Sequence, residues 1–189
     1  MKSIYYSISL FIFAIVFTAC VTSKKTSTIV GTDYDAEKDC TNHFVLPYGS
    51  VSMPGKWNKD GGNLISGQQF FKNKDSIGVA IAFNPSSNYE FNKNGALTGF
   101  KFAKAFYEWD SKYFVDHGLN RILIEQDSIN NFIVYRIYGN TSQRKFDTYF
   151  LIGEKNKNAS NFSITYTDKW TEQKKVDFLK TLFLVKKEG

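Results

Sequence analysis

The sequence contains few of the residues from which disulfide frameworks, metal centres and catalytic sites are built. Its 189 residues include two cysteines, two histidines and three prolines. With Cys20 and Cys40 as the only cysteines, stability must come from a hydrophobic core rather than from a set of bridges. Aromatic residues make up 17% of the chain, which argues against a disordered protein.

Local motifs of several enzyme classes are also missing. The sequence has no P-loop, no dinucleotide-binding fingerprint and no G-x-S-x-G nucleophile motif. The formal net charge is +6, yet no run of five or six like charges occurs, and Lys and Arg are interspersed with Asp and Glu. These observations predict a protein that is not an enzyme, needs no cofactor and binds no nucleic acid.

The first 19 residues have the layout of a secretory signal peptide. An apolar stretch runs from Ile4 to Ala19, interrupted by tyrosine and serine, after the single charge of Lys2. This stretch is too short for a membrane-spanning helix, which needs about 20 predominantly apolar residues. We therefore predict that residues 1–19 are removed as a signal peptide and that the mature chain begins at Cys20.

The residues around the predicted cleavage site, Phe17-Thr18-Ala19-Cys20, resemble the lipobox of bacterial lipoproteins, although Phe17 stands where leucine is usual. The resemblance implies that Cys20 is acylated, with palmitate as a typical chain, and that it anchors the protein to a lipid bilayer. The expected location is the bacterial cell envelope, at the periplasmic face of the outer membrane. The alternative is a short signal anchor in which Cys20 is only a small apolar residue. Residues 20–38 are polar and lack a hydrophobic period, which predicts a flexible tether.

The remaining residues, 39–189, predict a single α+β domain with a largely antiparallel sheet. Over Ile77–Phe83, apolar residues alternate with Gly78, Ala80 and Ala82, whose small size indicates close packing on that face. Further strands are predicted over Ser50–Met53, Leu64–Lys72, Leu119–Gln126, Phe132–Tyr138, Phe146–Ile152 and Phe162–Tyr166, separated by turn clusters such as "KDGG" and "GNTSQ". Helical spacing predicts one helix from Thr98 to Gly118 and a second helix from Thr171 onwards.

The first predicted helix carries an aromatic stripe. Phe102, Phe106, Trp109 and Tyr113 recur at helical spacing and therefore share one face. Such a stripe can line a ligand groove, but helices that lie on sheets routinely bury stripes of this kind. We therefore interpret the stripe as part of the core.

Two segments of the chain resemble parts of PsbP-like domains. "GSVSMPGKW" is similar to their opening strand, and "NFSITYTDKWTEQKKVDFLKTLFLV" is similar to their closing strand, helix and terminal strand. The resemblance covers the order of elements over residues 50–187. It implies an α/β/α sandwich with about six to seven strands and two helices, in a family whose members are mostly binding or assembly modules. No functional residue is carried over, because no position matches a family site residue by residue.

The residues with ligand or catalytic chemistry each have an ordinary structural explanation. Cys40 and His43 have the spacing of half a metal site, but no second pair completes it, so we predict no metal centre. His117 stands at the end of the predicted helix, where its cationic form suits the negative end of the helix dipole. Glu108 and Asp110 are two positions apart and point to different sides of a helix, so they form no ready carboxylate pair.

Two short tripeptides raise the question of glycosylation. Asp75-Ser76-Ile77 and Asp127-Ser128-Ile129 resemble the Asp-Ser/Thr-apolar motif that carries O-glycans on exported proteins of the Bacteroidetes. Aspartate and serine also favour turns on their own account, and this is the interpretation we prefer.

The sequence thus predicts a membrane-anchored lipoprotein that acts as a noncatalytic binding or assembly module, with an envelope protein as a further expected partner. Two alternatives stay open. One is an envelope enzyme, hydrolase-like, whose site is assembled only in three dimensions. The other is a carrier of a small ligand.

Overall fold

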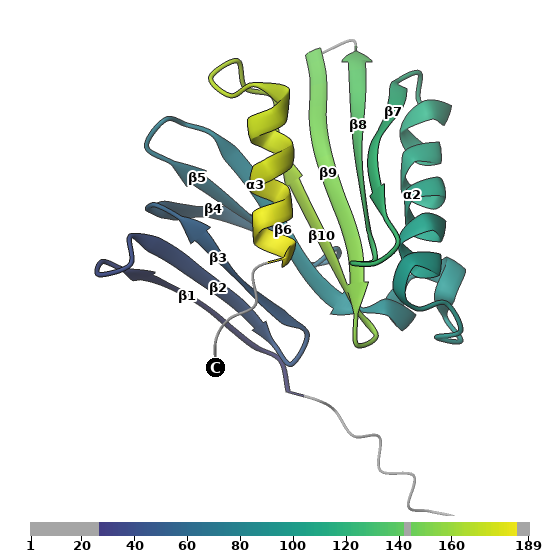
Figure 1. Ribbon diagram of the computed structural model, residues 1–189, viewed down its shortest axis with the longest axis horizontal. Coiled ribbons are helices and arrows are strands. Elements are labelled where there is room, and N and C mark those ends of the chain that lie inside the picture. Colours follow the sequence, from purple (N-terminus) through teal and green to yellow (C-terminus); the bar gives the residue numbers. More distant parts are fainter. Residues whose placement is uncertain (1–26, 142–144, 185–189) are drawn as a thin grey trace, which may run out of the picture.

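The computed structural model describes residues 27–141 and 145–184, so the predicted signal peptide and Cys20 lie outside the described part of the chain. The described residues form three layers (Figure 1). A seven-stranded antiparallel sheet is the middle layer; one helix covers one of its faces, and a second helix with a three-stranded sheet covers the other. The α+β class, the antiparallel sheet and its two helices agree with the sequence-based prediction.

The large sheet has the strand order β4-β5-β6-β10-β9-β8-β7, with antiparallel pairing throughout. Its strands are β4 (Trp57–Asn63), β5 (Gln68–Asn73), β6 (Gly78–Pro85), β7 (Asn120–Asp127), β8 (Phe132–Asn140), β9 (Lys145–Lys155) and β10 (Asn158–Ile164). The last strand, β10, pairs with both β6 and β9 and so joins the two halves of the sheet.

The alternation of side chains along the strands divides the interior into two cores. In β6, Val79, Ile81 and Phe83 face the core that contains α3 (Glu172–Leu184) and the three-stranded sheet. In β8, Ile133 and its alternate neighbours face the core beneath α2 (Gly99–Asp116). Because successive side chains of a strand point to opposite faces, the period of two specifies both cores at once.

The helix α2 has the bounds that the sequence predicts. It follows Thr98 and ends before His117, whose backbone N–H donates to the carbonyl of Phe114. Gly118 has a φ of +82°, a conformation that favours glycine and ends the helix. Neither α2 nor α3 is long and apolar enough to span a membrane, as judged over the described residues.

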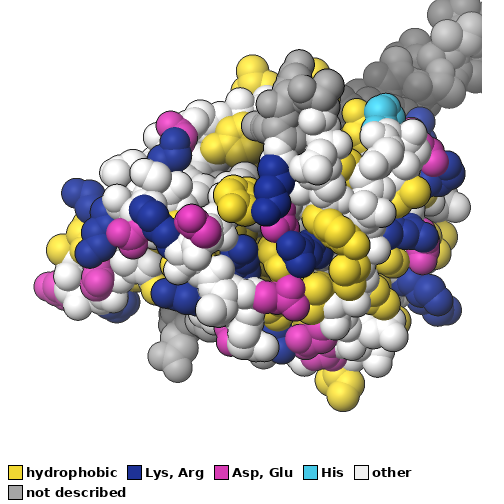
Figure 2. Space-filling model, turned by 90° about the horizontal axis from the view of Figure 1, so that it is seen from above, with side chains coloured by type: hydrophobic (Ala, Val, Ile, Leu, Met, Phe, Trp, Pro, Cys, Tyr) yellow, Lys and Arg dark blue, Asp and Glu magenta, His cyan; other side chains and the backbone are white. Residues whose placement is uncertain are grey.

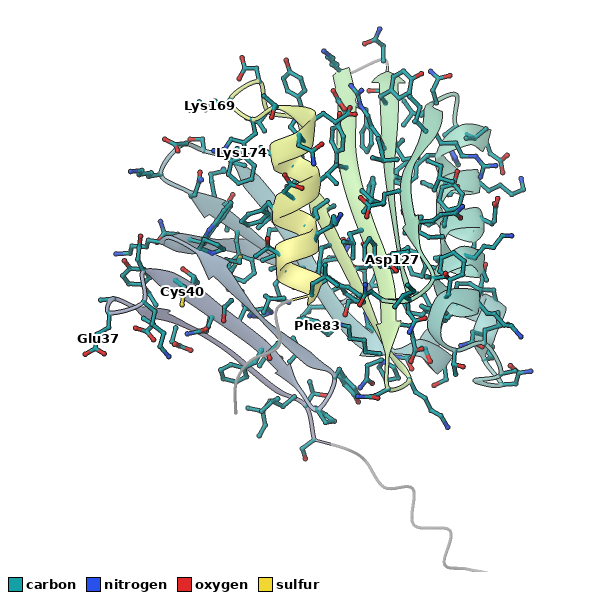
Figure 3. All side chains as sticks on the ribbon, in the orientation of Figure 1. Glu37, Cys40, Phe83, Asp127, Lys169 and Lys174 are labelled. Carbon is teal, nitrogen blue, oxygen red and sulfur yellow. The ribbon has the colours of Figure 1, made fainter. Side chains whose placement is uncertain are left out.

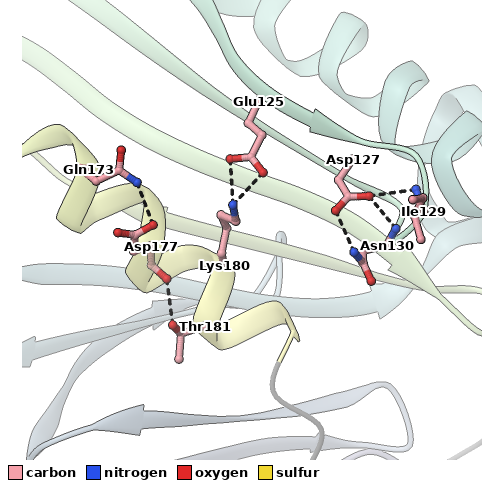
Figure 4. A network of polar contacts seen from close by, with 8 residues as sticks. All are labelled: Glu125, Asp127, Ile129, Asn130, Gln173, Asp177, Lys180 and Thr181. Carbon is pink, nitrogen blue, oxygen red and sulfur yellow. Dashed lines mark hydrogen bonds and ion pairs between the residues drawn. The ribbon is translucent and has the colours of Figure 1, made fainter.

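The helix α3 is held to the large sheet by apolar and polar contacts. Leu179 and Phe183 are buried against the sheet. On the polar side, the Lys180 ammonium donates to both carboxylate oxygens of Glu125 in β7, at 2.7 and 3.0 Å (Figure 4). In Figure 1, α3 therefore crosses in front of the sheet, with the three-stranded sheet beside it.

From Ile29 onwards, the three-stranded sheet contradicts the prediction that residues 20–38 form a flexible tether. It contains β1 (Ile29–Asp35), β2 (Cys40–Leu46) and β3 (Gly49–Pro54), in that order. β1 pairs with β2 from Ile29 opposite Leu46 to Asp35 opposite Cys40. Most side chains of β1 are exposed, so backbone hydrogen bonds hold the strand and no apolar alternation marks it in the sequence.

A second correction concerns the stretch from Trp57 to Lys72. The sequence predicts a turn at "KDGG" and a strand from Leu64, whereas Lys59–Gly62 belongs to β4 and contains a register shift. The chain turns instead after Asn63, whose side-chain carbonyl accepts the backbone N–H groups of Ile65 and Ser66. Leu64 and Ile65 are consequently almost fully exposed, at 98% and 100%. Asn63 is thus the residue that specifies the turn, through its side-chain hydrogen bonds.

The surface carries charges of both signs. Lys and Arg side chains are interspersed with Asp and Glu over the face in Figure 2. Several of them pair, as in the exposed ion pairs between Lys72 and Asp60 and between Lys112 and Asp116. This mixture agrees with the interspersed charges of the sequence.

Candidate functional site

A cavity of about 700 Å³ lies beside α2, on the face of the large sheet that this helix covers only in part. The helix packs over β7, β8 and β9, and the neighbouring strands β10 and β6 form the floor of the cavity. The walls come from the C-terminal half of α2, the short helices η1 (Ser86–Asn88) and η2 (Glu90–Asn92), and the tip of the β4–β5 hairpin.

Two cross-strand neighbours form part of the cavity floor. Ala82 of β6 and Asn161 of β10 are direct cross-strand partners, and both line the floor. The small residues of β6 predict close packing on this face, and Ala82 is only 2% exposed although it borders the cavity. The Oδ1 atom of Asn161 is buried and has no hydrogen-bond partner among the described residues. A hydrogen-bond donor on a ligand would remove the energetic cost of leaving such a buried amide oxygen without a partner.

The aromatic stripe of α2 forms the wall, and it divides along its length. Phe102 and Phe106 are 0% and 1% exposed, as the core interpretation predicts. Trp109 and Tyr113 are 39% and 61% exposed and line the cavity, so the core interpretation is wrong for this half of the stripe. The ring of Tyr89, just before η2, lies 4.9 Å from Phe106 and 6.1 Å from Trp109, measured between centroids.

Two carboxylates line the same cavity. The Tyr135 hydroxyl donates to Oδ2 of Asp110 at 2.5 Å, and burial raises the pKa of Asp110 while this hydrogen bond opposes the rise. Glu90 accepts a hydrogen bond from the indole N–H of Trp109 at 2.5 Å. Burial also raises the pKa of Tyr89 to about 12, so this phenol is neutral over the physiological range. The cavity therefore combines aromatic rings with oriented polar groups.

Cys40 and His43 do not form a site together. They lie three residues apart on β2 and therefore on opposite faces of the strand, and Cys40 belongs to the small sheet, away from α2 (Figure 3). Nδ1 of His43 lies 3.0 Å from the carbonyl oxygen of Gly31 and 2.9 Å from Oγ1 of Thr32. Within residues 27–141 and 145–184, no group of three His, Cys, Asp or Glu side chains is placed to hold a metal ion.

The other predicted residues have the placements that the sequence indicates. His117 is exposed at the end of α2, with Nδ1 2.6 Å from the carbonyl oxygen of Tyr113. Glu108 accepts a hydrogen bond from Arg121 at 3.2 Å, whereas Asp110 faces the cavity. The two carboxylates thus lie in different surroundings and do not form a pair.

Both serines of the glycosylation tripeptides lie in exposed turns. Ser76 has a φ of +61° between β5 and β6, and Ser128 lies between β7 and β8. The Asp127 carboxylate accepts the backbone N–H groups of Ile129 and Asn130 (Figure 4). A turn of this type accounts for an aspartate before Ser128 without a modification.

Comparisons with known proteins give likenesses of structure alone. No protein-family model matches the sequence. No curated protein matches it either. A crystal structure of a protein from Bacteroides thetaiotaomicron VPI-5482 is similar over 74% of this chain, with 14% identity and a TM-score of 0.43. The match covers 46% of that protein, so this chain spans less than half of its length.

The solution structure of cyanobacterial PsbP (CyanoP) from Synechocystis sp. PCC 6803 is also similar. It matches 87% of this chain and 95% of its own, with 11% identity and a TM-score of 0.38. CyanoP bears the name of the family that the two sequence segments resemble. Identities and TM-scores this low carry no ligand or partner over to this protein.

Proposed function

We propose that this protein is a lipid-anchored module of the bacterial envelope that binds a small ligand in the cavity beside α2 and does not transform it. The cavity carries this proposal. Its volume of about 700 Å³ lies within the range of roughly 300–1,000 Å³ that is common for small-molecule sites. Aromatic walls with a few converging polar groups are likewise typical of such sites.

The polar groups of the cavity support binding rather than catalysis. Its lining, which consists of described residues, contains Ser66 but no His, Cys or Lys that would activate a nucleophile. Asp110 and Glu90 each already accept a hydrogen bond, from Tyr135 and Trp109. Such fixed acceptors orient a ligand without requiring a proton to move.

Exposed aliphatic side chains near the start of β1 support an anchor at Cys20. Ile29 and Leu46 are 60% and 47% exposed there, beside each other in the β1–β2 ladder. Leu64, at the tip of the β4–β5 hairpin, lines a small depression together with Val30 of β1. The few residues between Cys20 and β1 reach about 30 Å at most when extended, which keeps this aliphatic end close to a bilayer.

The anchor is tested by labelling cells with palmitate. The wild-type protein is expected to take up label, and the Cys20→Ser variant is expected to take up none. Equal labelling of the two proteins would refute acylation of Cys20 and leave the signal-anchor alternative.

Ligand binding is tested by native mass spectrometry of the full-length protein extracted from its own membrane. We expect a bound small molecule in the wild type and its loss in Ala82→Leu, which fills the cavity floor. Ala96→Leu is the matched control, because Ala96 is exposed and outside the cavity. A wild-type protein with no small molecule but a stoichiometric protein partner would instead support an assembly module.

A further inference from the structure

The charged side chains that line the cavity beside α2 are all acidic. They are Asp110, on α2, and Glu90, in η2, and the lining contains no Lys or Arg. The whole chain has the opposite bias, with 24 Lys and Arg against 18 Asp and Glu. The cavity is therefore an acidic site within a basic protein, which selects against anionic ligands.

Neither carboxylate has a cationic partner in the part of the chain that the structure describes. Among the described residues, no ion pair joins Asp110 or Glu90 to a Lys or Arg side chain. The hydrogen bond to Asp110 comes from a neutral phenol, that of Tyr135. A cation that enters beside a partly buried carboxylate stabilises its charged form, because the cation compensates for the lost hydration. A neutral donor does so only in part.

The aromatic side chains of the cavity suit the same kind of ligand. Tyr89, Phe106 and Trp109 form a tight group, with centroid distances of 4.9, 5.6 and 6.1 Å, and Tyr113 follows one helical turn after Trp109. The faces of such rings carry negative charge density and attract cations, tryptophan most strongly. Quaternary ammonium groups in particular bind among several aromatic rings.

We propose that the cavity binds an organic cation, with an alkylammonium group held between Asp110 and the rings of Trp109 and Tyr113. This inference rests on the proposed ligand-binding function and names its ligand class. The unpartnered Oδ1 of Asn161, on the floor, would accept a hydrogen bond from an N–H or O–H elsewhere on the ligand. A neutral sugar also suits aromatic rings and amides, but it would leave Asp110 without a counter-charge.

The test is calorimetric titration of the full-length protein in detergent with three cations, tetramethylammonium, choline and spermidine. The neutral probes are 3,3-dimethylbutan-1-ol, which has the shape of choline without its charge, and glucose. N-phenyl-1-naphthylamine reports whether the cavity accepts any apolar molecule. We expect at least one cation to bind, and 3,3-dimethylbutan-1-ol to bind about tenfold more weakly than choline or not at all.

Substitutions then locate the site. Asp110→Asn keeps the shape of the side chain and is expected to weaken cation binding about tenfold, with no change for the naphthylamine. Asp116→Asn is the control, because Asp116 lies on the same helix outside the cavity and pairs with Lys112. Equal weakening by Asp110→Asn and Asp116→Asn would overturn the assignment to this cavity.

The outcomes separate the two proposals. If the neutral alcohol or glucose binds as well as the cations, or if only the naphthylamine binds, the organic-cation inference is wrong and the binding function stands. If no probe binds and the protein carries no small molecule from its own membrane, both are wrong.

Discussion

The hydroxyl of Tyr135, in the middle of β8, lies 2.5 Å from Oδ2 of Asp110 on α2. This hydrogen bond connects the buried core beneath the helix with the polar side of the cavity. Burial is the main cause of a raised pKa at both residues, and the neighbouring carboxylate raises the pKa of Tyr135 further. The pair therefore keeps a carboxyl group beside the cavity at a cost to the stability of the fold.

The first prediction concerns this cost. Because burial raises the pKa of Asp110 above its ordinary value of 3.8, the protonated form is the better tolerated one in the folded state. The contribution of the protonated Asp110 side chain to stability is fully present below pH 3.8. It is lost as the pH rises through the pKa that Asp110 has in the folded state. Tyr135 and Tyr89, which both interact with Asp110, stay neutral over this range.

Asp110→Asn should accordingly be more stable than the wild type at pH 7, with a difference that shrinks as the pH falls toward 4. Thermal unfolding between pH 4 and pH 7 measures this, and Asp116→Asn is the control for removing a carboxylate from the same helix outside the cavity. A melting temperature of Asp110→Asn below that of the wild type at pH 7 would contradict the prediction.

The second prediction concerns His43, which is fully buried next to Phe71. Its Nδ1 must carry the proton that is donated to the carbonyl of Gly31, so Nε2 is left buried without a partner among the described residues. Burial lowers the pKa of His43, and Lys59 lowers it further, although the hydrogen bond to Gly31 opposes this. The neutral ring therefore stabilises the fold above pH 6.5, and this stability is lost as the pH falls toward the pKa of the folded state.

His43→Phe should remove this loss between pH 6.5 and pH 5, because phenylalanine fills the same space and does not titrate. Chemical unfolding at both pH values measures the effect, and His117→Phe, at an exposed position, is the control. His43→Ala, in contrast, should destabilise the protein at all pH values by opening a cavity. A stability of the wild type that stays constant over this range would contradict the assignment.

Much of the fold follows from local patterns. The helix from Thr98 to Gly118 and the strands over Ile77–Phe83 and Phe132–Tyr138 have clear periods, because each buries one or two complete faces. β1 and the far end of β4 lie at sheet edges and expose most of their side chains, so burial imposes no period on them. Their pairing depends mainly on backbone hydrogen bonds, which every residue except proline can donate.

The third prediction concerns the polar contacts beside α3. Arg136 donates from Nε and Nη2 to the two oxygens of Asp147, at 2.7 and 2.8 Å, and the Asp147 side chain is 7% exposed. Asp147→Asn keeps the shape but removes the charge from this bidentate pair. We expect it to lower the free energy of unfolding by about 1.5–3 kcal/mol, as for hydrogen bonds between charged groups.

Urea unfolding measures this difference. Asp60→Asn is the matched control, because Asp60 pairs with Lys72 at the surface and such pairs contribute about 0–1 kcal/mol. Equal effects of Asp147→Asn and Asp60→Asn would show that the buried pair adds nothing beyond a surface contact.

The cavity depends on spatial information that the sequence does not display. Ala82 and Asn161 lie far apart in the chain and become neighbours only through the register of β6 and β10. The aromatic stripe does indicate the wall, but its spacing is the same for Phe106, which is buried, and Tyr113, which is not. The strand order decides which strands lie beneath α2 and which lie beside it, under the cavity. The small residues of β6 are a second local indication of this face.

The fourth prediction concerns Ser76 and Ser128. The hydrogen bonds of Asp127 explain its tripeptide as a turn, and Asn73 accepts the backbone N–H groups of Asp75 and Ile77 in the other. We therefore expect the intact mass of the native mature protein to equal polypeptide plus lipid. An additional sugar mass that disappears in Ser128→Ala or Ser76→Ala would establish glycosylation, for which both exposed turns are accessible.

The last prediction separates the two halves of the aromatic stripe. Phe102 is fully buried against Phe106, Tyr89 and Phe91, so Phe102→Ala should lower the free energy of unfolding by about 3–5 kcal/mol. Trp109 is 39% exposed, and the same truncation should cost only about 1–2 kcal/mol because less apolar surface leaves water when the protein folds.

The order is reversed for ligand binding. Trp109→Ala removes a wall of the cavity and releases Glu90, so it should abolish retention of the native ligand in a protein that still folds. Phe102 does not line the cavity, and Phe102→Ala should retain the ligand at temperatures well below its lowered melting point. Urea unfolding and native mass spectrometry of the same preparations measure both quantities. If Trp109→Ala destabilises the protein as much as Phe102→Ala and leaves the ligand bound, the whole stripe belongs to the core and the cavity is not the binding site.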